Sequence, residues 1–287
     1  MEAPYLSDQE AAYGALRVVC LANDKGGVAK TTSCVNLAAS LARRGKAVLC
    51  MDMDPQANAT IALGLDPDAP DRDWETYALL TDPHLALERV ILPTAVPNLD
   101  AVPADRQLSS CEKALINEVG RETRLRNKLR DYSRSLFTKK YDIVLVDCPP
   151  SLDLITINSL VAATDIIVPV QPKLYSLKGM ARLGETIATL YYQLQVRIRL
   201  LGVLVCLYDR SACLDGVVYD LLKQKVTREY GDFVFHNIIA KSVLISEAEA
   251  GGKPVVIADP ESAAAHAYEA VAEELLDRLE RSQPVYA

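Results

Sequence analysis

The residues with the clearest chemical potential form the run KGGVAKTT, residues 25–32. Gly26 and Gly27 carry no Cβ, so the backbone can turn there and point its N–H groups at phosphate oxygens. Lys30 would reach the β and γ phosphates of a nucleotide, and Thr31 would offer a hydroxyl to Mg²⁺. The expected phosphate-binding residues are Lys25, Gly26, Gly27, Val28, Ala29, Lys30, Thr31 and Thr32.

Elements in the right order flank this run. The apolar residues 18–22 predict a buried strand, and residues 31–44 have apolar side chains at helical spacing. The N-terminus of that helix would add partial positive charge to a phosphate site. The general pattern G-x-x-x-x-G-K-[ST] is nevertheless not met, because Asp24 and Ala29 stand at its two glycine positions. A glycine-rich turn without a nucleotide therefore stays the alternative for this run taken alone.

Two acidic segments weaken that alternative. Residues 47–51 form an apolar strand followed by Asp52 and Asp54, and residues 143–146 form another strand followed by Asp147. Open α/β sheets bind their ligands at the carboxyl ends of the strands, so these acids and the phosphate loop would converge on one cleft. A single acid could be a turn residue or a helix cap. Three acids together with the loop indicate a site for a nucleotide and Mg²⁺.

In this order and spacing, the motifs resemble those of the ParA branch of the deviant Walker A ATPases, whose members carry KGGVGKTT, DxDPQGN and DCPPSL-like segments. The stretch IAKSVLISEAEAGGKPVVIADP, residues 239–260, is similar to the family's IPRNVRLSEAPSFGKPI. The resemblance covers residues 17 to about 280. It implies a partition ATPase that binds ATP and Mg²⁺, forms a homodimer with ATP, and hydrolyses ATP slowly under stimulation by a ParB-like or cargo-adaptor protein.

The resemblance also implies roles for single residues. Lys25 is the signature lysine that reaches across the dimer to the other subunit's phosphates, and Asp54 orients the attacking water. The expected catalytic set is Lys25, Lys30 and Asp54. The expected metal ligands are Thr31, Asp52 and Asp147. A cation supplied by the partner subunit would act like an arginine finger, so hydrolysis should depend on dimerisation.

Three residues depart from the family pattern around this site. Ala29 replaces a loop glycine, which is sterically mild if the residue has helical backbone angles. Ala57 replaces the glycine of DPQGN, where a methyl could stiffen the segment. Asp24 adds a carboxylate near the phosphates, and the sequence alone does not say whether it faces them.

The resemblance further implies nonspecific DNA binding, but the family's DNA-contacting arginines are displaced here. The YDART-like segment reads Tyr208-Asp209-Arg210-Ser211, and the second arginine of the C-terminal stretch is Leu244. The first group of candidate DNA contacts is Arg210, Lys223, Lys225, Arg228 and Lys241.

The second candidate is a basic helix over residues 121–140, which hold eight basic and two acidic residues. Helical spacing puts Leu125, Leu129 and Leu136 on its buried stripe and predicts solvated faces for most of the cations, Lys128 among them. An ordinary solvated helix face is the alternative for this run. The net charge of −7 excludes basic character throughout the chain but not one local phosphate-binding patch.

The order of the elements predicts a doubly wound α/β fold, a mainly parallel sheet with helices on both faces, of the kind found in P-loop NTPases. Half of the 287 residues are hydrophobic, enough for one ATPase domain over residues 17–287 after a short leader of residues 1–16. Further strands are expected at 165–170, 200–207, 232–236 and 255–258, and helices at 108–137, 176–195, 215–230 and 261–281. Residues 64–107 are expected to be an irregular insertion.

Two other functions stay open. One is a metabolic ATP-dependent ligase or synthetase of the same fold, and the other is a MinD-like positioning ATPase. A membrane switch is disfavoured because the polar face of the last expected helix is acidic, and no run of 18 apolar residues is present. We therefore expect a cytoplasmic protein without a membrane partner, associated with the nucleoid if it binds DNA. The cargo, whether plasmid, chromosome or protein assembly, is not encoded in these motifs.

Overall fold

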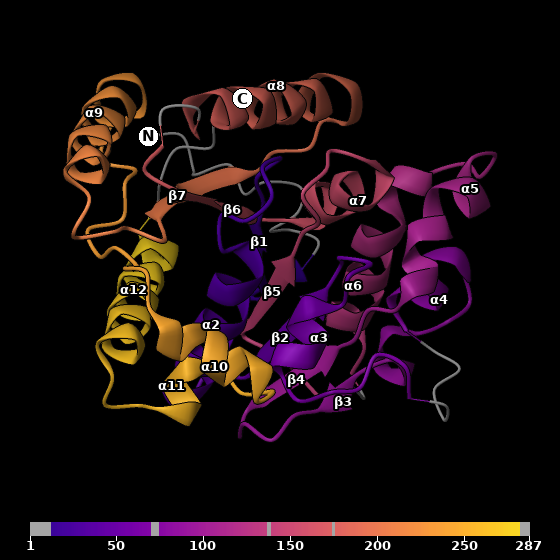
Figure 1. Ribbon diagram of the computed structural model, residues 1–287. Coiled ribbons are helices and arrows are strands. Elements are labelled where there is room, and N and C mark those ends of the chain that lie inside the picture. Colours follow the sequence, from indigo (N-terminus) through magenta and orange to yellow (C-terminus); the bar gives the residue numbers. More distant parts are fainter. Residues whose placement is uncertain (1–12, 70–74, 137–138, 174–175, 282–287) are drawn as a thin grey trace.

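The computed structural model describes residues 13–69, 75–136, 139–173 and 176–281. Within these residues the strands form one seven-stranded sheet in the order β3-β4-β2-β5-β1-β6-β7 (Figure 1). The strands are β1 (Arg17–Leu21), β2 (Val48–Asp52), β3 (Leu92–Pro93), β4 (Leu99–Val102), β5 (Ile143–Asp147), β6 (Asp165–Val170) and β7 (Arg199–Val205). Only β3 and β4 pair antiparallel, so the described sheet is almost wholly parallel.

Helices cover both faces of the sheet, and each face has its own hydrophobic core. One face carries α2 (Lys30–Arg43), α3 (Asn58–Ala62), α10 (Val243–Ala250), α11 (Val255–Ala258) and α12 (Ala263–Glu280). The other carries α4 (Thr76–Thr81), α5 (Cys111–Leu115), α6 (Arg124–Arg134), α7 (Leu154–Ala162), α8 (Ser176–Leu194) and α9 (Cys213–Tyr230). The short 3₁₀ turns are η1 (Leu87–Arg89), η2 (Arg106–Ser110) and η3 (Arg121–Thr123). The doubly wound α/β fold expected from the sequence is confirmed.

The register of the central strands decides which residues meet at the carboxyl edge. β5 lies between β1 and β2, and all five residues of β2 and of β5 are buried. In this register Asp147 lies beside Leu21 on one side and beside Asp52 on the other. The strand that precedes the phosphate loop and the two strands that precede the acidic segments therefore end side by side.

Several expected elements differ from the structure. Residues 255–258 form the short helix α11 and not a strand, and residues 232–236 make only an isolated bridge at Val234. The stretch 64–107 is not an irregular insertion, because it contains α4, β3 and β4, and β4 pairs with β2. The helix expected over 108–137 is broken into η2, α5, η3 and α6.

Short apolar runs explain these errors. Four apolar residues such as 255–258 fit a buried strand and a buried helix turn equally well. Here Val255 and Val256 pack between α2, α10 and α12, so tertiary contacts decide in favour of the helix. The four residues of β4 are too few to show a clear alternation. Of the expected leader, residues 1–12 lie outside the described part of the chain, and the division at residue 17 stays a prediction.

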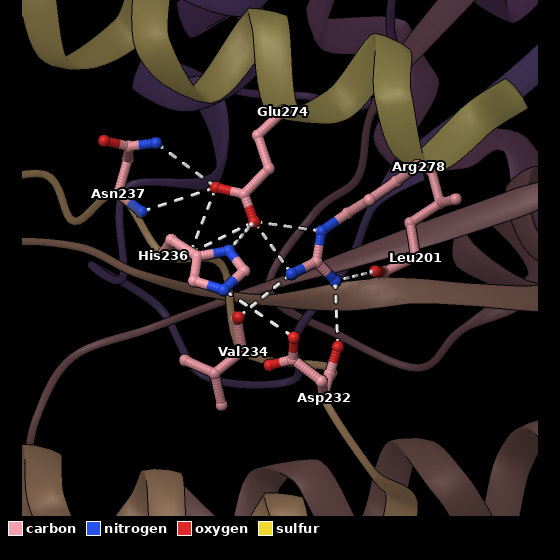
Figure 2. A network of polar contacts seen from close by, with 7 residues as sticks. All are labelled: Leu201, Asp232, Val234, His236, Asn237, Glu274 and Arg278. Carbon is pink, nitrogen blue, oxygen red and sulfur yellow. Dashed lines mark hydrogen bonds and ion pairs between the residues drawn. The ribbon is translucent and has the colours of Figure 1, made fainter. Parts of the chain in front are cut away.

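The last helix is tied to the sheet by a buried arginine. Figure 2 shows Arg278 of α12 pointing toward β7, where its Nη1 donates to the Leu201 carbonyl at 2.7 Å. Its Nη2 donates at 2.9 Å to the carbonyl of Val234, which bridges to β7 at Val203. Glu274, one turn earlier, accepts from the same guanidinium at 2.8 Å and from the ring Nδ1 of His236, which lies at 2.9 Å. At Gly202 a Cβ would lie 2.4 Å from the Phe233 carbonyl oxygen and 2.9 Å from Arg278 Nη1, so a larger residue there would disturb the backbone as well as the arginine.

The apolar face of α12 is fully used inside the protein. Its buried residues pack against α2, whereas Glu273, Asp277 and Glu280 are exposed and Glu274 is directed inward onto Arg278. Among the residues that the structure describes, no helix combines the length and the apolar character needed to cross a bilayer.

We predict that Glu274→Gln destabilises the fold near neutral pH. Burial alone would raise the pKa of Glu274, but the hydrogen bonds from His236 and Arg278 outweigh it and hold the pKa below its ordinary value. A depressed carboxyl pKa adds stability that is present above the unfolded-state pKa and is lost as the pH falls through the folded-state value. The variant should lose about 1.5–3 kcal/mol of unfolding free energy at pH 7 in urea titrations, because the buried guanidinium loses its charged partner.

The difference between the two proteins should begin to shrink as the pH falls below the ordinary carboxyl pKa of about 4.3, and it is lost as the native carboxyl becomes protonated. Glu280→Gln, at the end of the same helix, is the control and should change little. Equal unfolding free energies for Glu274→Gln and the native protein at pH 7 would contradict this account.

Candidate nucleotide-binding site

The loop between β1 and α2 is anchored to the neighbouring strand β6. The side chain of Asn23 donates from Nδ2 to the Pro169 carbonyl at 2.8 Å, and its Oδ1 accepts from the Lys25 backbone N–H at 3.0 Å. Asn23 is buried, so these two hydrogen bonds fix the position of the backbone just before Gly26 and Gly27. Gly27 has a φ of 69°, in the left-handed region that glycine adopts without strain. The backbone thus turns sharply just before α2.

Lys30 is the first residue of α2 and is directed back into the loop. Only 7% of it is exposed, and its Nζ donates to the Lys25 carbonyl at 3.0 Å. Burial lowers the pKa of Lys30, while the nearby carboxylates of Asp147 and Asp54 oppose that shift. The ammonium therefore lies in the mouth of the loop with negative charges close by. It is placed to meet phosphate oxygens as they replace the Lys25 carbonyl.

Thr31 and Asp147 form the pair that best fits a magnesium ion. The Thr31 hydroxyl donates to Asp147 Oδ2 at 2.7 Å, and Asp147 Oδ1 is buried with no hydrogen-bond partner among the described residues. Burial raises the pKa of Asp147 well above its ordinary value, and the charge of Asp52 raises it further. A buried carboxylate oxygen without a donor is costly, and a divalent cation with its water shell would relieve that cost. The donor set of a hydroxyl and a carboxylate suits Mg²⁺.

Asp52 has a different environment. Its Oδ2 accepts from both the backbone N–H and the hydroxyl of Thr60 at 2.8 Å, and its Oδ1 accepts from the Asp54 backbone N–H at 3.0 Å. Burial raises the pKa of Asp52 to about 6, and these hydrogen bonds limit the rise. Because protein donors occupy both oxygens, this carboxylate holds the segment from Asp54 to Thr60 in place. Its contact with a metal stays a prediction.

Asp54 and Lys25 flank the loop opening. Asp54 is 7% exposed, and its Oδ1 accepts from the Gln56 backbone N–H at 2.9 Å. Lys25 is half-buried, and its ammonium makes no hydrogen bond or ion pair with any other residue that the structure describes. The catalytic roles of both residues stay predictions. The carboxylate of Asp24 forms an ion pair with Arg182 of α8, whose guanidinium lies 3.5 Å away.

Both alanines that replace family glycines have left-handed backbone angles. Ala29 has a φ of 65° at the N-cap of α2, and Ala57 has a φ of 53° at the N-cap of α3. The methyl group of Ala29 is predicted to have little steric effect only if the residue has helical backbone angles. Its left-handed angles do not meet this condition. A left-handed conformation costs a residue with a Cβ about 1–2 kcal/mol. The phosphate loop and the segment after Asp54 each carry this strain at the residue that starts a helix.

Two residues of the site were missed in the sequence. Asn23 and Thr60 hold the loop and the Asp52 segment, and both are buried. A polar residue directly after an apolar strand was a usable signal for Asn23. No sequence spacing predicts the contact between Asp52 and Thr60, because it depends on the direction that the backbone takes at residue 57.

The basic run 121–140 is largely neutralised within the protein. Its ion pairs are Arg121 with Glu122, Arg124 with Glu118, Arg130 with Asp131 and Lys139 with Asp100. Lys128, expected on a solvated face, is buried and donates to the carbonyls of Asp82, Pro83 and Leu85. Leu136, expected in the buried stripe, is 89% exposed because α6 ends at Arg134. The run is therefore a poor match to a phosphate-binding helix.

The other candidate cations lie on α9 and on the two loops beside it. Lys223, Lys225 and Arg228 are exposed on α9, and an open hollow on that helix is lined by Lys223 and Arg228 together with Asp220, Leu221, Gln224 and Thr227. Arg210 and Lys241 are also exposed, and the backbone bridge between Tyr208 and Ala240 brings their loops together. Lys223, Arg228 and Arg210 make no ion pair with any other described residue, so these three are more available to an external anion than most cations of run 121–140.

The chain is similar to known proteins over most of its length. Residues 16–200 match the family model described as an AAA domain. The chain is 37% identical to the sporulation initiation inhibitor protein Soj of Bacillus subtilis, with 90% of this chain and 98% of that protein covered. It is 39% identical to the chromosome-partitioning ATPase Soj of Thermus thermophilus, with coverages of 93% and 98%.

The fold also matches a solved structure at a TM-score of 0.77, with 30% identity. That structure is cobyrinic acid a,c-diamide synthase from Mycobacterium smegmatis with bound ADP and magnesium, and the match covers 94% of this chain and 99% of that one.

We predict that Ala29→Gly and Ala57→Gly each stabilise the protein. Glycine removes the strain of the left-handed conformation but makes the unfolded chain more flexible, so the net gain should be about 0.5–1 kcal/mol per substitution. Thermal unfolding without nucleotide should show a Tm increase of about 2 °C for each variant.

The matched control is Ala270→Gly, in the right-handed interior of α12, which should lower stability by about 1 kcal/mol. If all three substitutions destabilised the protein alike, the two alanines would not be strained.

Proposed function

The chain belongs to the ParA/MinD family of P-loop ATPases, and on this basis we propose that it is a partition or positioning ATPase whose ATP-bound dimer binds DNA nonspecifically. The observation that carries the proposal is the meeting of Lys30, Thr31, Asp54 and Asp147 around one loop opening. These residues supply a cation, a metal-binding pair and an acid to the same small volume. That combination serves phosphoryl transfer from ATP to water.

Within one subunit, each residue of the site has a separate role in binding or hydrolysing ATP. The loop N–H groups and Lys30 bind the β and γ phosphates, and Thr31 and Asp147 would hold Mg²⁺, which neutralises phosphate charge when bound. Asp54 accepts a hydrogen bond from the attacking water and orients it toward the γ phosphate. Asp52 keeps Asp54 in position through the hydrogen bond to its backbone N–H.

Lys25 is assigned to the second subunit's nucleotide. Its backbone is fixed by Asn23 while its ammonium has no partner among the described residues, so the charge is available for a contact outside its own loop. A cation arriving from a partner stabilises the charge that spreads over the phosphoryl oxygens in the transition state. Hydrolysis would then require the ATP-bound homodimer, and a ParB-like or cargo-adaptor protein would stimulate it.

DNA contact is assigned to the α9 surface, defined as Lys223, Lys225, Arg228, Arg210 and Lys241. Support comes from the exposure of these cations and from the internal neutralisation of run 121–140. Binding by a few local cations is independent of DNA sequence and weakens with salt. An acidic chain can bind DNA in this way, and the protein would then associate with the nucleoid.

A second candidate function is a diamide synthase, favoured by the similarity to the Mycobacterium smegmatis structure of that name. Such an enzyme would use the same ATP site together with an acid substrate. If ATP were consumed only after addition of cobyrinic acid, this candidate would replace the positioning ATPase.

We predict that Lys25→Ala lowers ATP turnover by about 10³-fold or more, because the transition state loses a cation supplied in trans. ATP binding by the isolated subunit should change little. Asp54→Ala should still bind ATP but hydrolyse it at least about 10²-fold more slowly. Turnover is measured as phosphate release, and binding with a fluorescent ATP analogue.

The control is Lys113→Ala, on the exposed surface of α5, which should behave as the native protein. Normal turnover in both Lys25→Ala and Asp54→Ala would remove these residues from the mechanism.

We predict that ATP converts the chain from monomer to dimer and that the dimer is retained on DNA at low salt. Lys223→Glu combined with Arg228→Glu should abolish retention and reduce the slope of log affinity against log salt by about 1 for each cation. Dimer formation is measured by light scattering, and retention with immobilised nonspecific DNA.

The matched control is Arg126→Glu combined with Arg134→Glu in run 121–140, and it should keep most of the retention on DNA. Loss of retention in this control alone would move the DNA contact to α6. No retention of the native dimer at low salt would remove DNA binding from the proposal.

A further inference from the structure

One buried carboxylate beside the phosphate loop has no role in the mechanism above. Glu249 lies in the last turn of α10, and its Oε1 is buried without a hydrogen-bond partner among the described residues. Burial raises the pKa of Glu249, and a hydrogen bond with the Thr32 hydroxyl opposes the rise. An acceptor left unsatisfied in this way destabilises the folded protein. A ligand that brings a donor would remove the cost.

Close packing fixes Glu249 relative to the loop. A Cβ on Gly252 would lie 3.1 Å from the Gly64 Cα, so the end of α10 touches the end of α3. On the other side, Asn36 of α2 donates to the Thr32 carbonyl at 2.9 Å and accepts from the Val256 backbone N–H at 3.4 Å. The carboxylate is therefore held beside the first turn of α2.

The position along a bound nucleotide follows from the order of residues in the loop. Lys30 and Thr31 serve the β and γ phosphates and their metal, and the backbone N–H groups cradle the α and β phosphates. Thr32 follows Thr31 on α2, and its hydroxyl contacts Glu249, whereas the acids that serve the γ phosphate, Asp54 and Asp147, surround Lys30. By this order we take Thr32, and Glu249 with it, to lie toward the end of the loop from which the ribose of a bound nucleotide extends.

The chemistry of Glu249 selects among the groups found there. Phosphate oxygens are acceptors and carry negative charge, so a carboxylate is not a ligand for them. Ribose hydroxyls are donors, and a carboxylate that accepts from them is a common way of holding a nucleoside. The family stretch quoted above has proline at this position, where this chain has the acceptor Glu249.

We infer that Glu249 accepts a hydrogen bond from a ribose hydroxyl of the bound nucleotide and makes the site selective for ribonucleotides over deoxyribonucleotides. The inference rests on the proposed function, because it requires a nucleotide in the phosphate loop. It adds a specificity-determining residue that takes no part in hydrolysis itself.

The test compares the affinities of ATP, 2′-deoxyATP and 3′-deoxyATP for the native chain and for Glu249→Leu. The native protein should bind ATP about tenfold more tightly than at least one deoxy analogue, since a hydrogen bond to a charged acceptor is lost. Glu249→Leu should bind ATP and that analogue equally, at the weaker affinity. Glu249→Gln retains a carbonyl acceptor and should restore part of the preference.

Thermal unfolding without nucleotide separates this role from a structural one. Leucine removes the unsatisfied acceptor and favours the helix, so Glu249→Leu should raise the Tm while it lowers ATP affinity. A residue needed only for folding would lower both. The matched control is Glu247→Leu, an exposed position on the same helix, which should leave the ATP preference unchanged.

The outcomes are distinct. Equal binding of all three nucleotides by the native chain overturns the ribose contact and leaves the ATPase proposal in place, and so does an unchanged preference in Glu249→Leu. Failure of the native chain to bind any of the three nucleotides overturns both the ribose contact and the proposed function.

Discussion

The burial of two carboxylates at the ends of adjacent parallel strands is the constraint on which the rest of the site depends. The register of β2 against β5 places Asp52 beside Asp147, and both are almost fully enclosed. Neither charge is tolerable there without compensation. Asp52 is compensated by the protein, through Thr60 and the backbone of Asp54. Asp147 is compensated only in part by Thr31, so one of its oxygens stays available to a cation. One register thus places side by side an acid held by protein donors and an acid with a free oxygen, the one that we propose binds the metal.

Strain and unsatisfied groups occur beside this pair but are not confined to it. Ala29 and Ala57 start helices in left-handed conformations, and Asp147 keeps a buried oxygen without a donor among the described residues. Elsewhere in the described chain, Arg199 and Glu269 also keep a buried polar atom without a hydrogen-bond partner, and Leu207 also has a positive φ. What distinguishes the oxygen of Asp147 is its place near the Thr31 hydroxyl and the ammonium of Lys30, where a cation could bind.

The surface cations differ in how far neighbouring groups pair with them. Along residues 121–140, neighbouring acids and carbonyl oxygens pair with most of the cations, and Lys128 is buried. On α9 the cations extend into solvent around an open hollow. Counting charges along the sequence does not distinguish cations that are paired inside the protein from cations that are exposed. What matters for binding a polyanion is the charge left after internal pairing.

The sequence by itself determined the fold class, the phosphate loop and the acids at the ends of β2 and β5, because apolar strands, helical periodicity and the loop motif are local patterns. It also placed β1, β2, β5, β6 and α8, α9 and α12 within a few residues. It failed at β4 and α11, where four residues are too few to show a periodicity, and at Lys128 and Leu136, whose environments depend on where α6 ends. Only the tertiary structure decided the left-handed backbone angles of Ala29 and Ala57. The same is true of the hydrogen bonds from Thr60 to Asp52 and of the buried, unsatisfied oxygen of Glu249. Each of them depends on contacts between segments far apart in the chain, and no local pattern records such contacts.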